Sequence, residues 1–226
     1  MTRATNARLA GFTFLFYIAI GITELVLGRA TSADGFAERL ALIAQHASQV
    51  RVTLILSLFT GFSALVLGVA LYGITRDEDH DLAMLALACR VGEGVLGAFP
   101  LTTLGLLWLA TTPGADASDT AAASALGAFL LKIAAWKTTI GATFFAVGST
   151  IFCWLLLRGR MIPVALAWLG VIASVVLVVG LPLQLAGLLR GALAQFMWLP
   201  MAAFEIPAGV WLLVRGVATA APRQST

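Results

Sequence analysis

An arginine and a glutamate, three positions apart, interrupt the long apolar stretch from Leu82 to Ala110. Arg90 and Glu93 lie on one face of a helix, because side chains three residues apart are neighbours there. The stretch is long enough to cross a bilayer, which needs about 20 apolar residues. Ionisable side chains that deep in a membrane are energetically costly and face a protein interior or a watery cavity. The pair therefore predicts an integral membrane protein with a buried polar centre.

The composition supports a membrane protein and excludes several other classes. Hydrophobic residues make up 60% of the 226 residues and charged residues 11%, whereas soluble domains carry roughly 25% charged residues. The net charge is only +3 and there is no basic stripe, so we expect no nucleic-acid partner. Cys89 and Cys153 both lie in apolar segments. This placement favours buried, reduced thiols over a disulfide framework or a zinc site.

Six apolar segments have the length of membrane spans. We predict an all-α membrane protein, a single domain built as a bundle of six transmembrane helices, with short amphipathic helices on the non-cytoplasmic side. The predicted spans are 9–28, 52–73, 82–110, 136–157, 162–185 and 193–214. Pro100 predicts a kink in the third span. Gly21 and Gly28 share a face of the first span, and we expect a neighbouring helix to approach them closely.

Two connections have features of amphipathic helices. Residues 29–50 contain capping residues followed by Phe36, Leu40 and Ile43 at helical spacing, which predicts a short helix at the membrane surface. Residues 121–135 are apolar but carry Lys132, and two alternatives remain for them. They extend the fourth span well beyond the bilayer, or they form a separate amphipathic helix, which we favour.

The distribution of basic residues predicts the orientation of the chain. Six spans place both termini on one side of the membrane. That side holds Arg3, Arg8, Arg76, Arg158, Arg160, Arg215 and Arg223, and the other side holds Arg29, Arg39, Arg51 and Arg190. Because cytoplasmic loops carry an excess of basic residues, we expect a multi-pass protein of the inner (plasma) membrane with both termini in the cytoplasm.

Three acidic and three basic residues lie within or close to the predicted spans, and their charges balance. They are Glu24, Glu93, Glu205, Arg90, Lys132 and Lys137. An unpaired ion in hydrocarbon costs several kcal/mol, so we expect these side chains to meet. The candidate ligand or ion pocket comprises Glu24, Arg90, Glu93, Lys137, Glu205, Trp136 and His46. Lys132 could instead extend its side chain to the membrane interface. Trp136 and Trp198 could instead belong to an interfacial aromatic belt.

No motif assigns a catalytic residue, a metal or a cofactor. A P-loop, a dinucleotide-binding fingerprint, a nucleophile elbow and a zinc-binding HExxH helix are all missing from the sequence. One hypothesis is a bundle that binds or moves a small molecule, a lipid or an ion through its charged centre. The alternative is a structural or partner subunit whose ion pairs only fix helix packing. A third hypothesis is a membrane-embedded enzyme, but no sequence motif supports it. A water-filled pocket at the charges would favour the first hypothesis, and dry pairs the second.

Several motifs, in their order along the chain, carry a resemblance to a known family. They are Cys89-Arg90-x-x-Glu93, the run from Arg158 to Pro163, and the ending Glu205-x-x-x-Gly209-Val210-Trp211. Over nearly its whole length the chain resembles the bacterial membrane family DUF4386. The resemblance implies a multi-span inner-membrane protein and carries no established activity, substrate or cofactor. The family commonly has an acid after the histidine of the first connection, but here Ala47 follows His46, which weakens a histidine–carboxylate role for His46.

Overall fold

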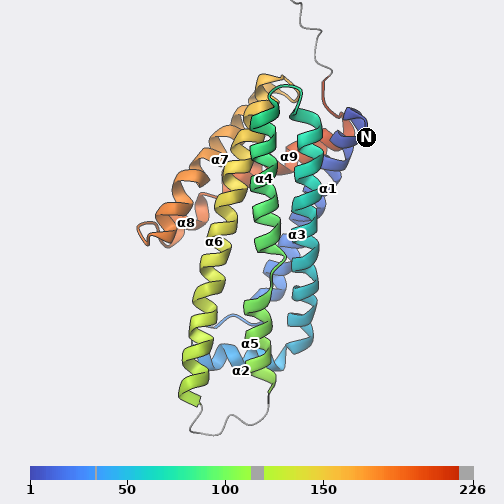
Figure 1. Ribbon diagram of the computed structural model, residues 1–226. Helices are drawn as coiled ribbons and strands as arrows, with labels where there is room; N and C mark the ends of the chain where they lie inside the picture. The colour runs from blue at the N-terminus through green and yellow to red at the C-terminus, as the bar shows by residue number, and fades with distance from the viewer. Residues whose placement is uncertain (34, 113–119, 219–226) are drawn as a thin grey trace, which may run out of the picture.

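Helices make up nearly all of the computed structural model, which describes residues 1–33, 35–112 and 120–218 (Figure 1). Six helical segments in these residues are long and apolar enough to cross a membrane, which confirms the predicted fold class. The helices are α1 (Arg3–Arg29), α2 (Phe36–Gln45), α3 (Ala47–Thr75), α4 (His80–Gly97), α5 (Leu101–Thr111), α6 (Thr120–Arg158), α7 (Val164–Leu185), α8 (Ala192–Phe196) and α9 (Leu199–Val214). The third segment is formed by α4 and α5 together, and the sixth by α8 and α9.

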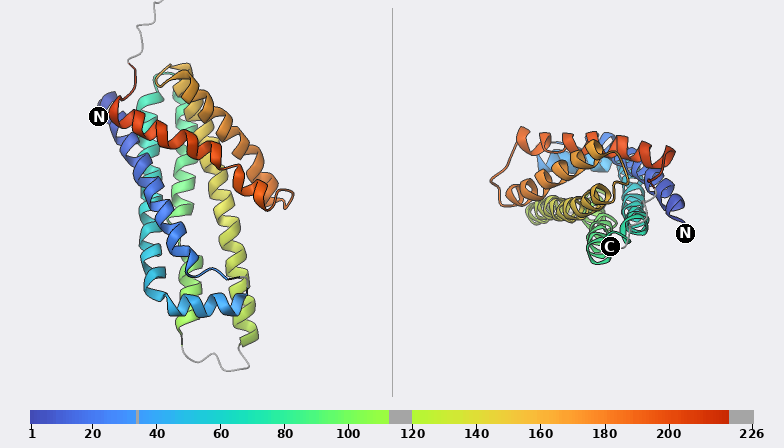
Figure 2. Two further views of the ribbon diagram at one scale, coloured as in Figure 1. Left: turned by 180° about the vertical axis from the view of Figure 1, so that it is seen from behind. Right: turned by 90° about the horizontal axis from the view of Figure 1, so that it is seen from above.

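The six spans pack in a closed ring that follows the order of the chain. α1 packs on α3, α3 on α4, α4 on α6, α6 on α7 and α7 on α9, and α9 returns to α1. Figures 1 and 2 show α7 and α9 beside only one half of the long helix α6, at the end where the described termini lie. α2 and α5 lie beside the other half. The ring therefore has an interior that α1, α4, α6 and α9 all reach.

Glycines set the closest approaches between neighbouring helices. A Cβ atom added to Gly11 of α1 would lie 2.6 Å from the carbonyl oxygen of Gly209 in α9. A Cβ added to Gly61 of α3 would lie 2.7 Å from the carbonyl oxygen of Gly94 in α4. The expectation for Gly21 and Gly28 is wrong, because no atom lies within 4 Å of a Cβ built on either residue. Small residues thus bring α1 close to a neighbour at its N-terminal end.

α6 is one continuous helix of 39 residues, Thr120–Arg158. At 1.5 Å per residue it is about 58 Å long, against a hydrocarbon core of about 30 Å. The favoured separation of residues 121–135 from the fourth span is therefore wrong. Lys132 and Lys137 do not interrupt the helix, because lysine is a good helix former. The other alternative, a helix longer than the bilayer requires, describes α6.

A second, smaller apolar core holds the far half of α6. Ile43, Val50, Leu106 and Leu107 form it, from α2, α3 and α5. The ring of Phe36 in α2 packs directly against Gly127 of α6. A short helix thus lies where the sequence predicts one in residues 29–50, and its place at the non-cytoplasmic surface stays a prediction.

The third span is interrupted where the sequence predicts a kink. α4 ends at Gly97 and α5 begins at Leu101, and Pro100 is the residue that precedes α5. Proline lacks an N–H donor and its ring disfavours a helical conformation in the residue before it. The backbone around Phe99 consequently leaves the helical pattern within the span, and its carbonyl oxygen becomes available to a side chain.

Candidate functional site

The centre of the ring is an ion pair between Arg90 and Glu93 of α4. The Arg90 Nη1 donates to the Glu93 Oε2 at 2.7 Å, and the two side chains are 2% and 9% exposed. The guanidinium carbon lies 5.1 Å from the centroid of the Phe145 ring in α6. On the α3 side Gly68 makes room, since a Cβ there would lie 2.8 Å from that of Arg90. The predicted pair is thus formed, buried and fixed by packing on both sides.

Tyr17 of α1 completes the coordination of the Glu93 carboxylate. Its hydroxyl donates a hydrogen bond to the Glu93 Oε1 at 3.0 Å. Each oxygen of Glu93 therefore has a donor of its own, one charged and one neutral. Buried carboxylates need such partners, because an unsatisfied charged acceptor is strongly destabilising.

Glu205 reaches the same centre from α9. Its carboxylate interacts electrostatically with Arg90 and Glu93. It forms no hydrogen bond or ion pair with any side chain in residues 1–33, 35–112 or 120–218, and it faces a cavity of about 240 Å³. Seven residues line this cavity: Tyr17, Glu93, Thr138, Ala142, Phe145, Trp198 and Glu205. Two carboxylates and three aromatic rings thus share one space.

Aromatic side chains form much of the wall of this cavity. The rings of Phe145 and Trp198 stack with their centroids 6.2 Å apart. On the other side of Arg90, toward the termini, a space of only about 10 Å³ remains among Phe14, Phe152 and their neighbours. The main apolar core fills that side of the ring. Little open space therefore remains on that side of Arg90.

A second polar cluster lies further along α1. Glu24 follows Tyr17 by two helical turns and accepts hydrogen bonds from Ser57 Oγ at 2.8 Å and Thr60 Oγ1 at 3.3 Å. Lys137 interacts electrostatically with Glu24. The single charged centre expected from the sequence is therefore divided into two clusters. One contains Arg90, Glu93 and Glu205, and the other contains Glu24 and Lys137.

The remaining predicted site residues lie outside both clusters. Trp136 is exposed, and its ring contacts Lys132, whose Nζ lies 5.7 Å from the ring centroid. His46 lies at the junction between α2 and α3. Trp198 lines the cavity and is also 37% exposed, so its place in an interfacial belt stays a prediction.

Sequence reasoning missed several members of the two clusters. Ser57, Thr60 and Phe145 carry no signal that separates them from ordinary residues of a span. Tyr17 does carry one, since it lies two turns before Glu24 on the same helical face. A polar residue on the face of an intramembrane acid is the pattern that could have identified it.

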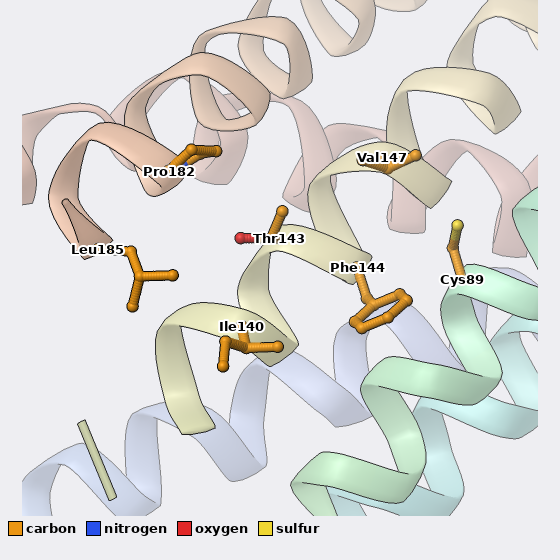
Figure 3. Close-up of a pocket in the computed structure, with 7 residues that line it drawn as sticks. All are labelled: Cys89, Ile140, Thr143, Phe144, Val147, Pro182 and Leu185. Carbon is orange, nitrogen blue, oxygen red and sulfur yellow. The ribbon is translucent and has the colours of Figure 1, made fainter. Parts of the chain in front are cut away.

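A larger groove of about 340 Å³ lies between α4, α6 and α7 and is apolar (Figure 3). Ile140, Phe144, Val147 and Leu185 line it, and Cys89 lies at its edge. Its one hydroxyl in view, that of Thr143, donates to the carbonyl oxygen of Thr139 at 2.9 Å. Apart from the free thiol of Cys89, the side chains that line the groove therefore offer a ligand little polar surface. Among the described residues no group of three or more His, Cys, Asp or Glu could hold a metal ion.

Comparison with known proteins gives a family but no activity. The sequence model of a family described as "Domain of unknown function (DUF4386)" matches residues 9–216. No curated protein and no solved structure matches the chain. The matched region contains all six spans almost completely, together with Tyr17, Arg90, Glu93 and Glu205. The chain therefore belongs to the DUF4386 family.

Proposed function

We propose that this protein binds a small amphiphilic organic cation in the cavity between Tyr17 and Glu205. The observation that carries the proposal is the Glu205 carboxylate. It faces the cavity without a hydrogen bond or ion pair to any described side chain, whereas Glu93 beside it has two partners. Intramembrane acids in such positions mark ligand or ion sites.

The charges of the site favour a cationic ligand. Arg90 neutralises the charge of Glu93 at 2.7 Å. The carboxylate of Glu205 is therefore a second negative group at the centre for which Arg90 is already engaged. A positive group in the cavity would neutralise it in a medium where an uncompensated charge is costly. The faces of aromatic rings attract cations as well, and Tyr17, Phe145 and Trp198 are all present. Carboxylates combined with aromatic rings suit an ammonium group.

The size and position of the cavity limit the ligand further. Its volume of about 240 Å³ lies just below the roughly 300 to 1,000 Å³ of sites for drug-sized molecules. The cavity therefore suits a compact head group. Because it lies between membrane-spanning segments, a ligand with an apolar part can partition into the bilayer and approach from there. The same cavity would bind the ligand and, if the ring of helices opened, would also allow the ligand to be moved.

A structural role remains for the other half of the centre. The Arg90–Glu93 pair is buried and packed, as expected of an ion pair that fixes the order of helix packing. We propose that the pair holds the ring together while Glu205 binds the ligand. We also propose the orientation expected from the sequence, with both termini in the cytoplasm. It is supported by the arginines at the helix ends beside the described termini, namely Arg3, Arg8, Arg76, Arg158, Arg160 and Arg215; Arg223 lies outside the described residues.

A series of matched small amphiphiles tests the proposal. The purified protein in a non-ionic detergent is titrated with hexyltrimethylammonium, hexylamine, hexanol and hexanoate, and thermal stability is measured. We expect the two cations to raise the melting temperature and the alcohol and the acid to leave it unchanged. Glu205→Gln keeps the shape of the side chain and should lower cation affinity about tenfold or more, since it removes a charged partner.

Glu24→Gln is the matched control, because it removes an intramembrane acid from the other cluster. It should leave the response to the cations close to that of the unaltered protein. Equal stabilisation by all four compounds, or unchanged cation binding in Glu205→Gln, would show that the cavity is not a cation site.

A further inference from the structure

We propose that the end of the bundle beside the described termini carries a binding site for the phosphate group of an anionic phospholipid, built around Arg160. The site is separate from the cavity at Glu205 and does not depend on its function. It lies where α6 ends and the chain turns toward α7. Three arginines and three tryptophans surround the two surface grooves there: Arg158, Arg160, Arg215, Trp154, Trp168 and Trp211.

The backbone of Arg160 is the first observation. Its φ of 49° makes it the one residue other than glycine with a positive φ in the part of the chain that the structure describes. The Arg160 N–H donates to the Leu157 carbonyl oxygen at 3.0 Å, and the Met161 N–H donates to that of Leu156 at 3.0 Å. This is the Schellman pattern, in which glycine is the usual residue at the left-handed position.

A side chain with a Cβ is disfavoured in this conformation, and residues held in such conformations cluster at functional sites. The only glycine in this turn, Gly159, lies one residue before the left-handed position. Gly159 packs so tightly that an added Cβ would lie 3.0 Å from the Glu78 Cδ. This packing explains Gly159, but it gives no reason for an arginine at position 160. The reason has to lie in what the Arg160 side chain contacts beyond the turn.

The surroundings of Arg160 are basic and aromatic. One groove of about 390 Å³ is lined by Arg158 and Arg160 between Trp154 and Trp168. A second groove, of about 360 Å³, lies on the other side of Arg160 and includes Trp211 and Arg215. Arg160 borders both grooves.

Of the three arginines, Arg158 alone forms an ion pair within the described residues. Asp79 pairs with Arg158 at 3.5 Å, and the Arg158 side chain is still 46% exposed. Arg160 and Arg215 form no ion pair with any residue that the structure describes. Both guanidinium groups are therefore without an ion pair to the described residues, and the acid beside the turn, Glu78, packs against Gly159.

This combination fits a phospholipid phosphate better than free phosphate. Guanidinium groups bind phosphate oxygens with paired hydrogen bonds. Tryptophans prefer the level of the lipid head groups, and basic pockets at the ends of spans bind anionic head groups. Leu157 and Val164 also line the first groove. They offer an apolar wall to the acyl chains, which a free phosphate ion would not use.

The αL conformation of Arg160 provides a sharp test. Arg160→Gly removes the guanidinium and also relieves the backbone, so the variant should fold at least as well as the unaltered protein. Both are incorporated into nanodiscs with defined mixtures of phosphatidylglycerol and phosphatidylcholine, and bound lipids are counted by native mass spectrometry. We expect a preference for phosphatidylglycerol in the unaltered protein. In Arg160→Gly we expect that preference to fall about fivefold, the effect of one basic residue near a membrane surface.

Arg51→Gln is the matched control, because it removes an exposed arginine from the opposite end of the bundle. It should keep the full preference. Unaltered phosphatidylglycerol preference in Arg160→Gly would overturn the proposal. So would equal stabilisation of the detergent-purified protein by inorganic phosphate and by phosphatidylglycerol, since that result would indicate a site for free phosphate.

Discussion

The Lys137 Nζ donates a hydrogen bond to the carbonyl oxygen of Phe99 at 2.8 Å, across the break between α4 and α5. Phe99 lies between the two helices, where a backbone carbonyl loses its regular helical partner. A backbone polar group at membrane depth needs a partner from the protein, because lipid offers none. Lys137 thus supplies the donor that the interruption at Pro100 requires, while its charge also acts on Glu24.

Lys137→Met should destabilise the protein, because it removes a charged hydrogen-bond donor from the break and keeps a side chain of similar length. A hydrogen bond to a charged group contributes about 1.5–3 kcal/mol, and the partial exposure of Lys137 places the expected loss at the lower end of this range. The measurement is the free energy of unfolding in a mild detergent. Lys132→Met is the matched control, since Lys132 and Lys137 are the only lysines in the chain. Lys132 forms no hydrogen bond or ion pair with the described residues, and its Nζ lies over the exposed ring of Trp136. Equal losses in the two variants would contradict a specific role for Lys137.

The sequence allowed the six spans to be predicted because hydrocarbon imposes a length and a composition on each of them. The interruption of the third span could be predicted too, since Pro100 acts through its own covalent structure. The length of α6 could not. Residues 121–135 pack against α2 and α5, for example through Phe36 and Gly127, and such contacts between distant segments cannot be read from the local sequence.

The candidate site shows the same division. That Arg90 and Glu93 would pair follows from their spacing on one helix. Which of the other charges would join them depends on the rotation of four helices about their axes. The sequence does not reveal that Glu205 reaches this pair or that Glu24 is drawn to Ser57 and Thr60 instead. Charge balance predicts that ions meet, but it does not say which ions meet.

Arg90→Met should sharply lower the yield of folded protein. It leaves the Glu93 carboxylate buried without its cation, and breaking a buried pair in this way costs about 3–5 kcal/mol. Folded yield is measured by size-exclusion chromatography after extraction in detergent. The double variant Arg90→Met with Glu93→Gln removes both charges and should recover much of the yield, because replacing a whole pair is often close to neutral.

If the double variant folded no better than Arg90→Met, the loss would come from the packing of the Arg90 side chain on Phe145 and not from the stranded charge. If Arg90→Met alone melted like the unaltered protein, the pair would have no structural role.

Tyr17→Phe should have a smaller effect than Arg90→Met. It removes the hydroxyl that donates to the Glu93 Oε1 at 3.0 Å and keeps the ring in the wall of the cavity. Removing the partner of a buried acceptor costs about 1–3 kcal/mol, and Glu93 keeps its bond to Arg90. Thermal denaturation should show this moderate loss, while the response to organic cations is retained through Glu205. Loss of cation binding at unchanged stability would instead assign the hydroxyl of Tyr17 to the ligand.

The packing of α1 predicts opposite outcomes for two chemically identical substitutions. Gly11→Ala adds a methyl group 2.6 Å from the Gly209 carbonyl oxygen, so α1 and α9 have to move apart. Overpacking of this kind costs about 1–3 kcal/mol. Gly21→Ala adds the same group where no atom lies within 4 Å, and alanine stabilises a helix by up to about 1 kcal/mol relative to glycine. Melting temperatures of the two variants should therefore shift in opposite directions.

The same pair of variants connects packing with the proposed cavity, because α1 carries Tyr17 and α9 carries Glu205. Separation of these helices at Gly11 should move the two side chains apart and weaken the binding of hexyltrimethylammonium. Gly21→Ala should bind it as the unaltered protein does, since it leaves the crossing of α1 and α9 unchanged. If Gly11→Ala lost stability but bound the cation with unchanged affinity, the cavity would not depend on the contact between α1 and α9. Glu205 would then be held in place by the packing of α9 on α7 and by the stacking of Trp198 on Phe145.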